Sequence, residues 1–240
     1  MTTNRLICRE VTKTYGTSFT LGPLSLDFTS GVACLVGPNG AGKSSFFRLA
    51  AAVDRPTAGT LELQVPDGPP RVGYLPQEPL LPSSATCEQF LHHVAWLQRI
   101  PRADRADAVT RALELTNLTA RRQNKIGTLS GGMRRRLGIA HALVHDPHLL
   151  LLDEPTVGLD PHQRVQLRKT ITAVGASRVV VVSTHLVEDV RGTADRVVVL
   201  HEGRARFDGT VAELENLADG SSDTLSGLEQ AMAALIGGDL

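Results

Sequence analysis

Two short runs of purely apolar residues constrain this chain most, Leu-Leu-Leu-Leu at positions 149–152 and Val-Val-Val-Val at positions 179–182. Neither run alternates apolar with polar side chains, so each is predicted to be a strand covered on both faces. A helix is predicted between them, because Asp160 can cap its start and Pro161 suits its first turn. Buried strands separated by helices indicate a parallel sheet in an α/β fold.

The rest of the chain divides into regions that differ in their predicted secondary structure. A sheet-rich start is predicted, with strands at residues 6–11, 20–28, 32–36, 60–65 and 71–75. Thr86 and Gln89 then form a capping-box pattern, and helices follow, so that residues 79–145 form a helical insertion. A hairpin-like pair follows at 197–200 and 204–207. We expect one main unit over residues 1–218 and a short C-terminal tail over 219–240.

Composition narrows the class of protein. Of the 240 residues, 42% are hydrophobic and 21% are charged, which is typical of a soluble globular protein rather than a disordered one. The formal net charge is zero, so no global field attracts nucleic acid or anionic lipid. The apolar runs are far shorter than the roughly 20 residues that span a bilayer, so any membrane role is expected to depend on a partner. Three scattered cysteines and no signal peptide favour the reducing cytoplasm.

The sequence Gly37-Pro-Asn-Gly-Ala-Gly-Lys43-Ser44 matches the phosphate-binding loop pattern. It lies between a predicted strand and a predicted helix, where glycines let backbone N–H groups and a helix N-terminus face an anion. Lys43 is predicted to reach the β- and γ-phosphates of a nucleotide, and Ser44 to hold Mg²⁺. The candidate nucleotide contacts here are Gly37, Pro38, Asn39, Gly40, Ala41, Gly42, Lys43, Ser44 and Ser45.

Two carboxylates, Asp153 and Glu154, follow the apolar run at 149–152. The carboxyl ends of parallel strands are the edge at which α/β sheets place their ligands. Taken alone the pair could simply begin a loop, but the upstream phosphate loop favours a catalytic interpretation. Asp153 is predicted to bind Mg²⁺, and Glu154 to polarise the water that attacks the γ-phosphate.

Ser130-Gly131-Gly132 precedes another predicted helix and so forms a second potential anion-binding N-terminus. Leu129-Ser-Gly-Gly-Met133, shortly before Asp153-Glu154-Pro, resembles the signature motif of ABC ATPases. The resemblance extends over nearly the whole chain. It implies a P-loop NTPase core with a mostly parallel sheet, an N-terminal antiparallel β region and a helical subdomain.

Other elements of that family occur in the expected order. By resemblance, Tyr15 is the aromatic that stacks on adenine, and Gln77 is the lid glutamine near Mg²⁺. Asp160, in Gly158-Leu-Asp-Pro, belongs to the dimer-contact loop, and His185 is the switch histidine at the γ-phosphate. Tyr15 could also be a core aromatic and Gln77 a solvated loop residue.

The family's geometry implies a head-to-tail dimer, formed with a second copy or a similar subunit. Ser130, Gly131 and Gly132 of one chain then cover ATP and Mg²⁺ held by the phosphate loop of the other. This chain departs from the family in having Met133 where glutamine is most common, followed by Arg134-Arg-Arg136. That departure concerns the fine tuning of the contact.

Two further patterns are predicted not to form a metal site or a nucleic-acid site. His141 and His145 lie one helical turn apart with His148 nearby, but no cysteine completes a metal site, so ordinary helix-end histidines are favoured. Residues 134–136 are all arginine, yet no interleaved aromatics accompany them. They are therefore predicted to be a solvated or partner-facing surface rather than a nucleic-acid patch.

The resemblance implies an ATPase subunit that powers a separate transmembrane permease from the cytoplasmic, inner face of the membrane. An alternative is a soluble ABC-type scaffold of the kind that serves iron–sulfur cluster assembly. A small-molecule kinase is a third, but it would need neither Leu-Ser-Gly-Gly nor Asp-Glu-Pro. The stretch at 183–190 and the Ala-Leu-Ile-Gly-Gly near the C-terminus look like the ATPases of bacterial exporters. The sequence names neither cargo nor permease.

Overall fold

Residues 4–217 and 227–237 are described by the computed structural model. Near the N-terminus, three strands form an antiparallel sheet in the order β2-β1-β4. Their bounds are Phe19–Thr29 for β2, Arg5–Tyr15 for β1 and Ala58–Gln64 for β4. Buried and exposed positions alternate along β2, as expected for a strand with one face on the core. The predicted N-terminal antiparallel region is confirmed.

A second sheet has six strands in the order β5-β6-β7-β3-β8-β9. All neighbouring strands are parallel except β8 and β9, which are antiparallel. The bounds are Val72–Leu75 for β5, Leu149–Asp153 for β6, Val179–Thr184 for β7, Gly31–Val36 for β3, Arg196–His201 for β8 and Arg204–Gly209 for β9. Every residue of β6 and β7 is buried, which explains why their sequences do not alternate. The predicted parallel α/β sheet is confirmed.

Helix α1 (Lys43–Ala50) lies between the two sheets. Its Phe46 and Phe47 share one core with Phe28 of β2 and Leu151 of β6. The rings of Phe28 and Phe46 are 5.9 Å apart between centroids. Because α1 contacts both sheets, the loop before it is anchored on either side.

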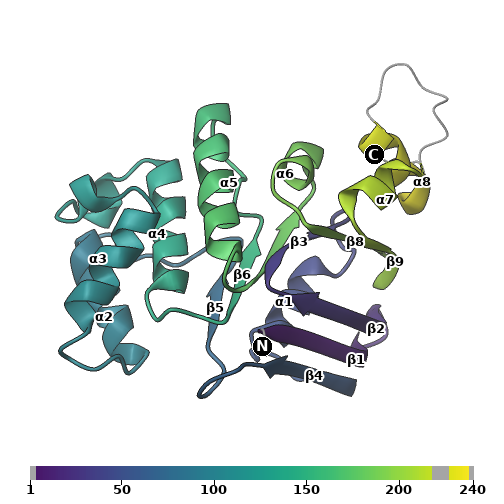
Figure 1. The fold of residues 1–240 in the computed structure, drawn as a ribbon, viewed down its shortest axis with the longest axis horizontal. Coiled ribbons are helices and arrows are strands. Elements are labelled where there is room, and N and C mark those ends of the chain that lie inside the picture. The colour runs from purple at the N-terminus through teal and green to yellow at the C-terminus, as the bar shows by residue number, and fades with distance from the viewer. Residues whose placement is uncertain (1–3, 218–226, 238–240) are drawn as a thin grey trace.

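The opposite face of the six-stranded sheet is covered by helices (Figure 1). They are α5 (Pro161–Gly175), α6 (Val187–Arg191), α7 (Val211–Glu215) and α8 (Gly227–Ile236). Asp160 caps α5 and Pro161 opens it, as predicted. Part of the predicted tail, residues 219–226 and 238–240, lies outside the described residues. Helix α8 packs Leu228, Met232 and Ile236 into the same core as the sheet.

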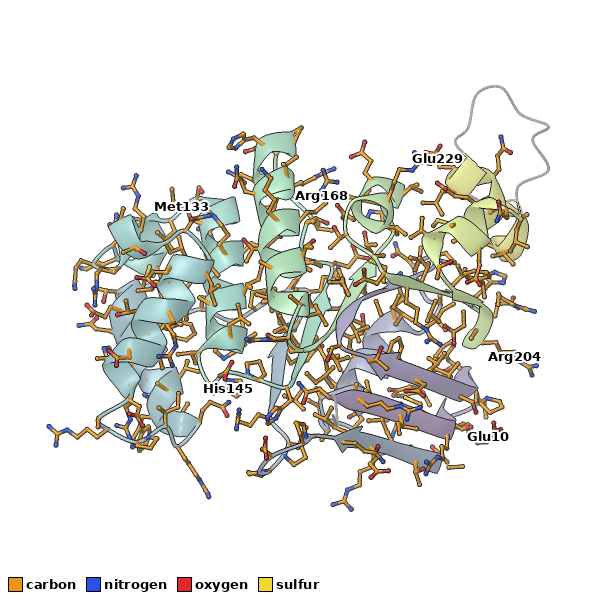
Figure 2. The ribbon with its side chains drawn as sticks, in the orientation of Figure 1. Glu10, Met133, His145, Arg168, Arg204 and Glu229 are labelled. Carbon is orange, nitrogen blue, oxygen red and sulfur yellow. The ribbon has the colours of Figure 1, made fainter. Side chains whose placement is uncertain are left out.

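The predicted helical insertion lies at one end of the molecule and has a hydrophobic core of its own (Figure 1). It contains α2 (Cys87–Leu97), α3 (Arg105–Leu115), the short turns η1 (Thr119–Arg121) and η2 (Ile126–Thr128), and α4 (Gly131–Leu143). Its helix α4 also packs Ile139, Ala142 and Leu143 into the core of the six-stranded sheet. The Thr86–Gln89 capping box is present in both directions. Figure 2 shows Met133 and His145 at opposite ends of α4, with His145 at the end nearer β5.

Among the helices in the described part of the chain, none has the length and apolar character required to cross a membrane.

Candidate functional site

The phosphate loop connects β3 to α1 at the carboxyl edge of the parallel sheet. Gly42, just before the helix, has φ of 105°, a left-handed conformation that favours glycine. At Gly37 the chain passes so close to β8 that an added Cβ would lie 2.1 Å from the Leu200 carbonyl oxygen. No side chain caps the start of α1, so its first N–H groups keep the capacity to bind an anion.

Lys43 points back into this loop. Its Nζ donates hydrogen bonds to the carbonyl oxygens of Gly37 (2.7 Å) and Pro38 (3.1 Å). Burial lowers the pKa of Lys43, while Glu154 and Asp153 oppose that shift by attracting the cation. The ammonium group is therefore a buried cation held by weak neutral acceptors, and phosphate oxygens would be stronger partners.

A cavity of about 420 Å³ opens at the loop. The volume of this cavity is in the range common for ligand sites. Three separate chain segments contribute predicted site residues to its wall. The predicted residues that line it are Asn39, Gly40, Gly42, Lys43, Ser44, Ser45, Gln77 and Glu154. The remaining predicted loop residues, Gly37, Pro38 and Ala41, shape the same loop from behind, where Gly37 and Ala41 are buried.

The two carboxylates at the end of β6 have different partners. Asp153 is 2% exposed, and its Oδ1 accepts a hydrogen bond of 2.5 Å from the Ser183 hydroxyl on β7. The same hydroxyl oxygen accepts a bond of 2.8 Å from the Glu154 N–H. Glu154 directs its carboxylate to His185, with Oε2 2.8 Å from Nδ1. Asp153 is thus fixed within the fold, whereas Glu154 reaches the cavity wall.

The Ser130 end of α4 and the Asp160 end of α5 do not line this cavity, although both are among the described residues. Ser130 caps α4 by accepting the Met133 N–H at 3.3 Å, and Asp160 accepts the Gln163 N–H at 2.9 Å. Ser130 and Gly131 are exposed, and a Cβ added to Gly131 would meet no described atom within 4 Å. This end of α4 is therefore open to an external ligand.

Phe19 lines the cavity, whereas Tyr15 is not among the lining residues. The two rings stack with centroids 6.3 Å apart. The Tyr15 hydroxyl is 3.3 Å from Asp54 Oδ2, and Lys13 Nζ lies 5.5 Å from the centre of the Tyr15 ring. Sequence reasoning missed Phe19, although its place directly before the predicted strand at 20–28, four residues after Tyr15, could have indicated it.

The prediction for the arginine run 134–136 is wrong at its middle residue. Arg134 is exposed, but Arg135 is 8% exposed and points into the protein. All its hydrogen-bond partners are backbone carbonyl groups of the Gln77 and Glu154 loops. Arg135 follows Gly132 by three positions and precedes Ile139 by four, and both are buried. Helical spacing could therefore have placed it on the inner face of α4.

The three histidines have different contact partners. His141 stacks on Phe90 with centroids 5.6 Å apart, His145 Nε2 is 3.1 Å from the Val72 carbonyl oxygen, and His148 Nδ1 accepts the Arg71 N–H. Burial lowers the pKa of each. Within the described residues no group of three potential ligands for a metal ion was found.

Comparison with known proteins identifies relatives. A family model described as ABC transporter matches residues 21–157, more than half of the chain. Nod factor export ATP-binding protein I of Burkholderia orbicola is 36% identical over 211 residues, covering 84% of this chain and 69% of the relative. An uncharacterized ABC transporter ATP-binding protein of Bacillus subtilis, YxlF, is 34% identical over 194 residues, covering 80% and 66%. The chain thus spans about two thirds of the length of these curated relatives.

A solved structure supports the fold assignment. The dimeric structure of a bacterial ABC transporter cassette superposes with a TM-score of 0.75 at 22% identity, covering 85% of this chain and 98% of the cassette. At this identity the likeness concerns the fold alone.

Proposed function

Because the chain belongs to the ABC transporter family of ATP-binding proteins, we propose that it hydrolyses ATP to power a separate transmembrane permease. The observation that carries this proposal is the cavity of about 420 Å³, in which the phosphate loop, Gln77 and Glu154 meet. Relatives with transporter names favour this function over an ABC-type assembly scaffold.

The triphosphate would lie along the loop and the start of α1. Backbone N–H groups of the first turn would donate to phosphate oxygens, and the helix dipole would add to their attraction. Lys43 would exchange its bonds to Gly37 and Pro38 for bonds to the β- and γ-phosphates. Phe19, stacked on Tyr15, offers an aromatic face for the base.

Mg²⁺ fits the oxygen donors at this edge of the sheet. Ser44 and Gln77 line the cavity, and Asp153, the buried residue before Glu154, is the proposed carboxylate ligand. Hydroxyl, amide and carboxylate oxygens are hard donors of the type that Mg²⁺ prefers. The ion would neutralise charge on the phosphates.

Glu154 is the proposed general base for the attacking water. Its backbone is fixed by the Ser183 hydroxyl, and its carboxylate is held 2.8 Å from His185 Nδ1. His185 is half exposed and lies between Glu154 and solvent. It would orient the carboxylate and sense the γ-phosphate.

A second ATP-binding chain would complete each site from outside. Ser130 and Gly131 are exposed at the start of α4, where a Cβ added to Gly131 would meet no described atom within 4 Å, and Asp160 is exposed as well. We therefore propose a head-to-tail dimer, formed with a second copy or a similar subunit, in which these ends cover the partner's ATP. The related cassette structure is described as dimeric.

The names of the relatives support the proposal that this chain acts with a permease. They also support the proposal that the permease exports its cargo from the cytoplasmic face of the membrane. One is named for Nod factor export, which concerns that protein's cargo and not this chain's. Affinity purification from native membranes, followed by identification of the protein that co-purifies, tests this part of the proposal. A permease is expected, and recovery of iron–sulfur assembly factors without a permease would contradict it.

Comparison of two carboxylate variants tests the ATPase mechanism. Glu154→Gln keeps the shape of the side chain but not its charge, so turnover should fall by about 10²–10⁴ while ATP binding persists. Because ATP is then retained, Glu154→Gln should accumulate as a dimer on size-exclusion chromatography with Mg²⁺-ATP. Asp153→Asn should remain monomeric, since it is expected to lose Mg²⁺, and Lys43→Ala should lose turnover. Wild-type turnover by Lys43→Ala, or a monomeric Glu154→Gln that binds ATP, would refute the mechanism.

A further inference from the structure

Arg135 is a buried cation with an unusual set of partners. Its side chain leaves α4 one turn after the Ser130 cap and enters the protein between two loops that reach the cavity. A guanidinium group has five N–H donors, and here five backbone carbonyl groups accept hydrogen bonds from it. No side-chain carboxylate is among these partners, so the arrangement differs from an ordinary buried ion pair.

The five acceptors belong to only two segments, residues 76–77 just after β5 and residues 153–155 at the end of β6. Nη1 donates to the carbonyl oxygens of Gln77 (2.6 Å) and Pro76 (3.3 Å). Nη2 donates to those of Glu154 (2.6 Å) and Asp153, and Nε donates to that of Pro155 (3.2 Å). One guanidinium group therefore holds the backbone of both segments that contribute Gln77 and Glu154 to the cavity wall.

Burying this cation is costly for the fold. Burial lowers the pKa of Arg135, and the charges of Asp153 and Glu154 compensate only in part. A well-packed apolar side chain often replaces a buried charge without loss of stability. The feature that an apolar residue cannot reproduce is the planar fork of donors that holds five carbonyl groups in fixed directions.

Glu154 needs such support. Its φ of 51° is left-handed, a conformation that costs a non-glycine residue about 1–2 kcal/mol. The Ser183 hydroxyl holds its N–H from the β7 side, and Arg135 holds its carbonyl oxygen from the α4 side. The direction of the carboxylate depends on both.

We propose that Arg135 is a positioning residue, which sets the orientation of Glu154 and Gln77 for ATP hydrolysis and ties both to the Ser130 end of α4. This inference rests on the proposed function. Arg135 acts through the backbone of the two loops, while Lys43 and the start of α1 bind the phosphates without it. Its loss should therefore reduce kcat while leaving the affinity for ATP nearly unchanged.

Arg135→Met and Arg135→Lys are the informative variants, with Arg136→Met as the matched control. Arg136 is the next residue of the same helix and donates one long bond, 3.4 Å, to the Asn117 carbonyl oxygen. Arg135→Met should lower kcat by about 10- to 100-fold, the effect expected when a catalytic group is misplaced by about 1 Å. Arg135→Lys keeps the charge but has at most three donors, so it should lie between the wild type and Arg135→Met.

Binding of a fluorescent ATP analogue supplies the second measurement. Its Kd should change by less than about threefold in both Arg135 variants, because uniform binding is not lost. If Arg135→Met fails to fold, Arg135→Lys carries the test alone. Equal losses of kcat and ATP-binding capacity, in proportion to unfolded protein, would mean that Arg135 is merely structural.

A double-mutant cycle separates positioning from general damage. If Arg135 acts mainly through Glu154, Arg135→Met combined with Glu154→Gln should be hardly slower than Glu154→Gln alone. Fully multiplying losses would overturn the inference. Absence of ATP hydrolysis by the wild type and Arg136→Met would instead refute the proposed function, whereas normal turnover by Arg135→Met would refute only the role of Arg135.

Discussion

Ser183→Ala removes one buried hydroxyl on which both carboxylate residues depend. Ser183 is 0% exposed, and its Oγ both donates to Asp153 Oδ1 at 2.5 Å and accepts the Glu154 N–H at 2.8 Å. Alanine keeps the Cβ and its packing. The space left by a hydroxyl is too small for a replacing water. Two buried polar groups would therefore lose a partner at once.

The expected cost follows from these two bonds. A hydrogen bond to a charged group contributes about 1.5–3 kcal/mol, and a buried donor left unsatisfied costs about 1–3 kcal/mol. Together they predict a fall of about 2.5–6 kcal/mol in the free energy of unfolding. For a chain of this size that corresponds to a Tm lower by about 5–24 °C.

Urea unfolding followed by circular dichroism measures the change, with Ser177→Ala as control. Ser177 is exposed, so its substitution should change the unfolding free energy by less than about 0.5 kcal/mol. Turnover of folded Ser183→Ala should also fall, by about tenfold, because the Glu154 backbone loses one of its two supports. A loss of stability below about 1 kcal/mol would show that this hydroxyl does not hold the two carboxylate residues as described.

Three other perturbations address separate parts of the molecule. Asp189→Asn should destabilise the fold by about 1–3 kcal/mol in urea, because a buried carboxylate that accepts two threonine hydroxyl bonds loses its charge; an unchanged midpoint would contradict this. Phe19→Ala should weaken ATP binding by about tenfold in a titration, whereas Tyr15→Phe keeps the stacked ring and should not. The pKa of His145 is lowered mainly by burial, with Arg71 also lowering it, so the unfolded chain binds the proton more readily. Stability should therefore fall below about pH 6.5, and His145→Gln should reduce that slope in Tm measured against pH.

The sequence predicted those parts of the fold that depend on local pattern. The apolar runs without alternation correctly predicted that β6 and β7 are buried on both faces. The Thr86–Gln89 and Asp160–Pro161 patterns correctly predicted where two helices begin. The phosphate loop and Glu154 were predicted from their motifs and from the edge of the parallel sheet, whereas Gln77 was assigned only by resemblance to ABC ATPases; all three line the cavity.

The sequence did not predict partners that come from distant segments. Arg135 lies 18 residues before Asp153 and 58 residues after Gln77. No local sequence pattern predicts contacts between residues so far apart in the chain. A run of three arginines is typical of an exposed surface, so this run did not indicate that Arg135 is buried. In the sequence Ser183 is only the first residue of the stretch at 183–190, and nothing there shows that its hydroxyl joins Asp153 and Glu154 at the end of β6.

The support around Glu154 explains why a strained residue can occupy this position. Its N–H is bonded to β7, its carbonyl oxygen to α4, and its carboxylate to the loop after β7, so three separate elements fix one residue. Strained backbone persists where the surrounding structure over-determines it, and such strain is concentrated at functional sites. Of these three bonds, the one from Arg135 connects the proposed base to α4, the helix that begins just after Ser130. A shift of α4 on closure with a partner chain would therefore move the Glu154 backbone directly, and hydrolysis would depend on that contact without any additional switch.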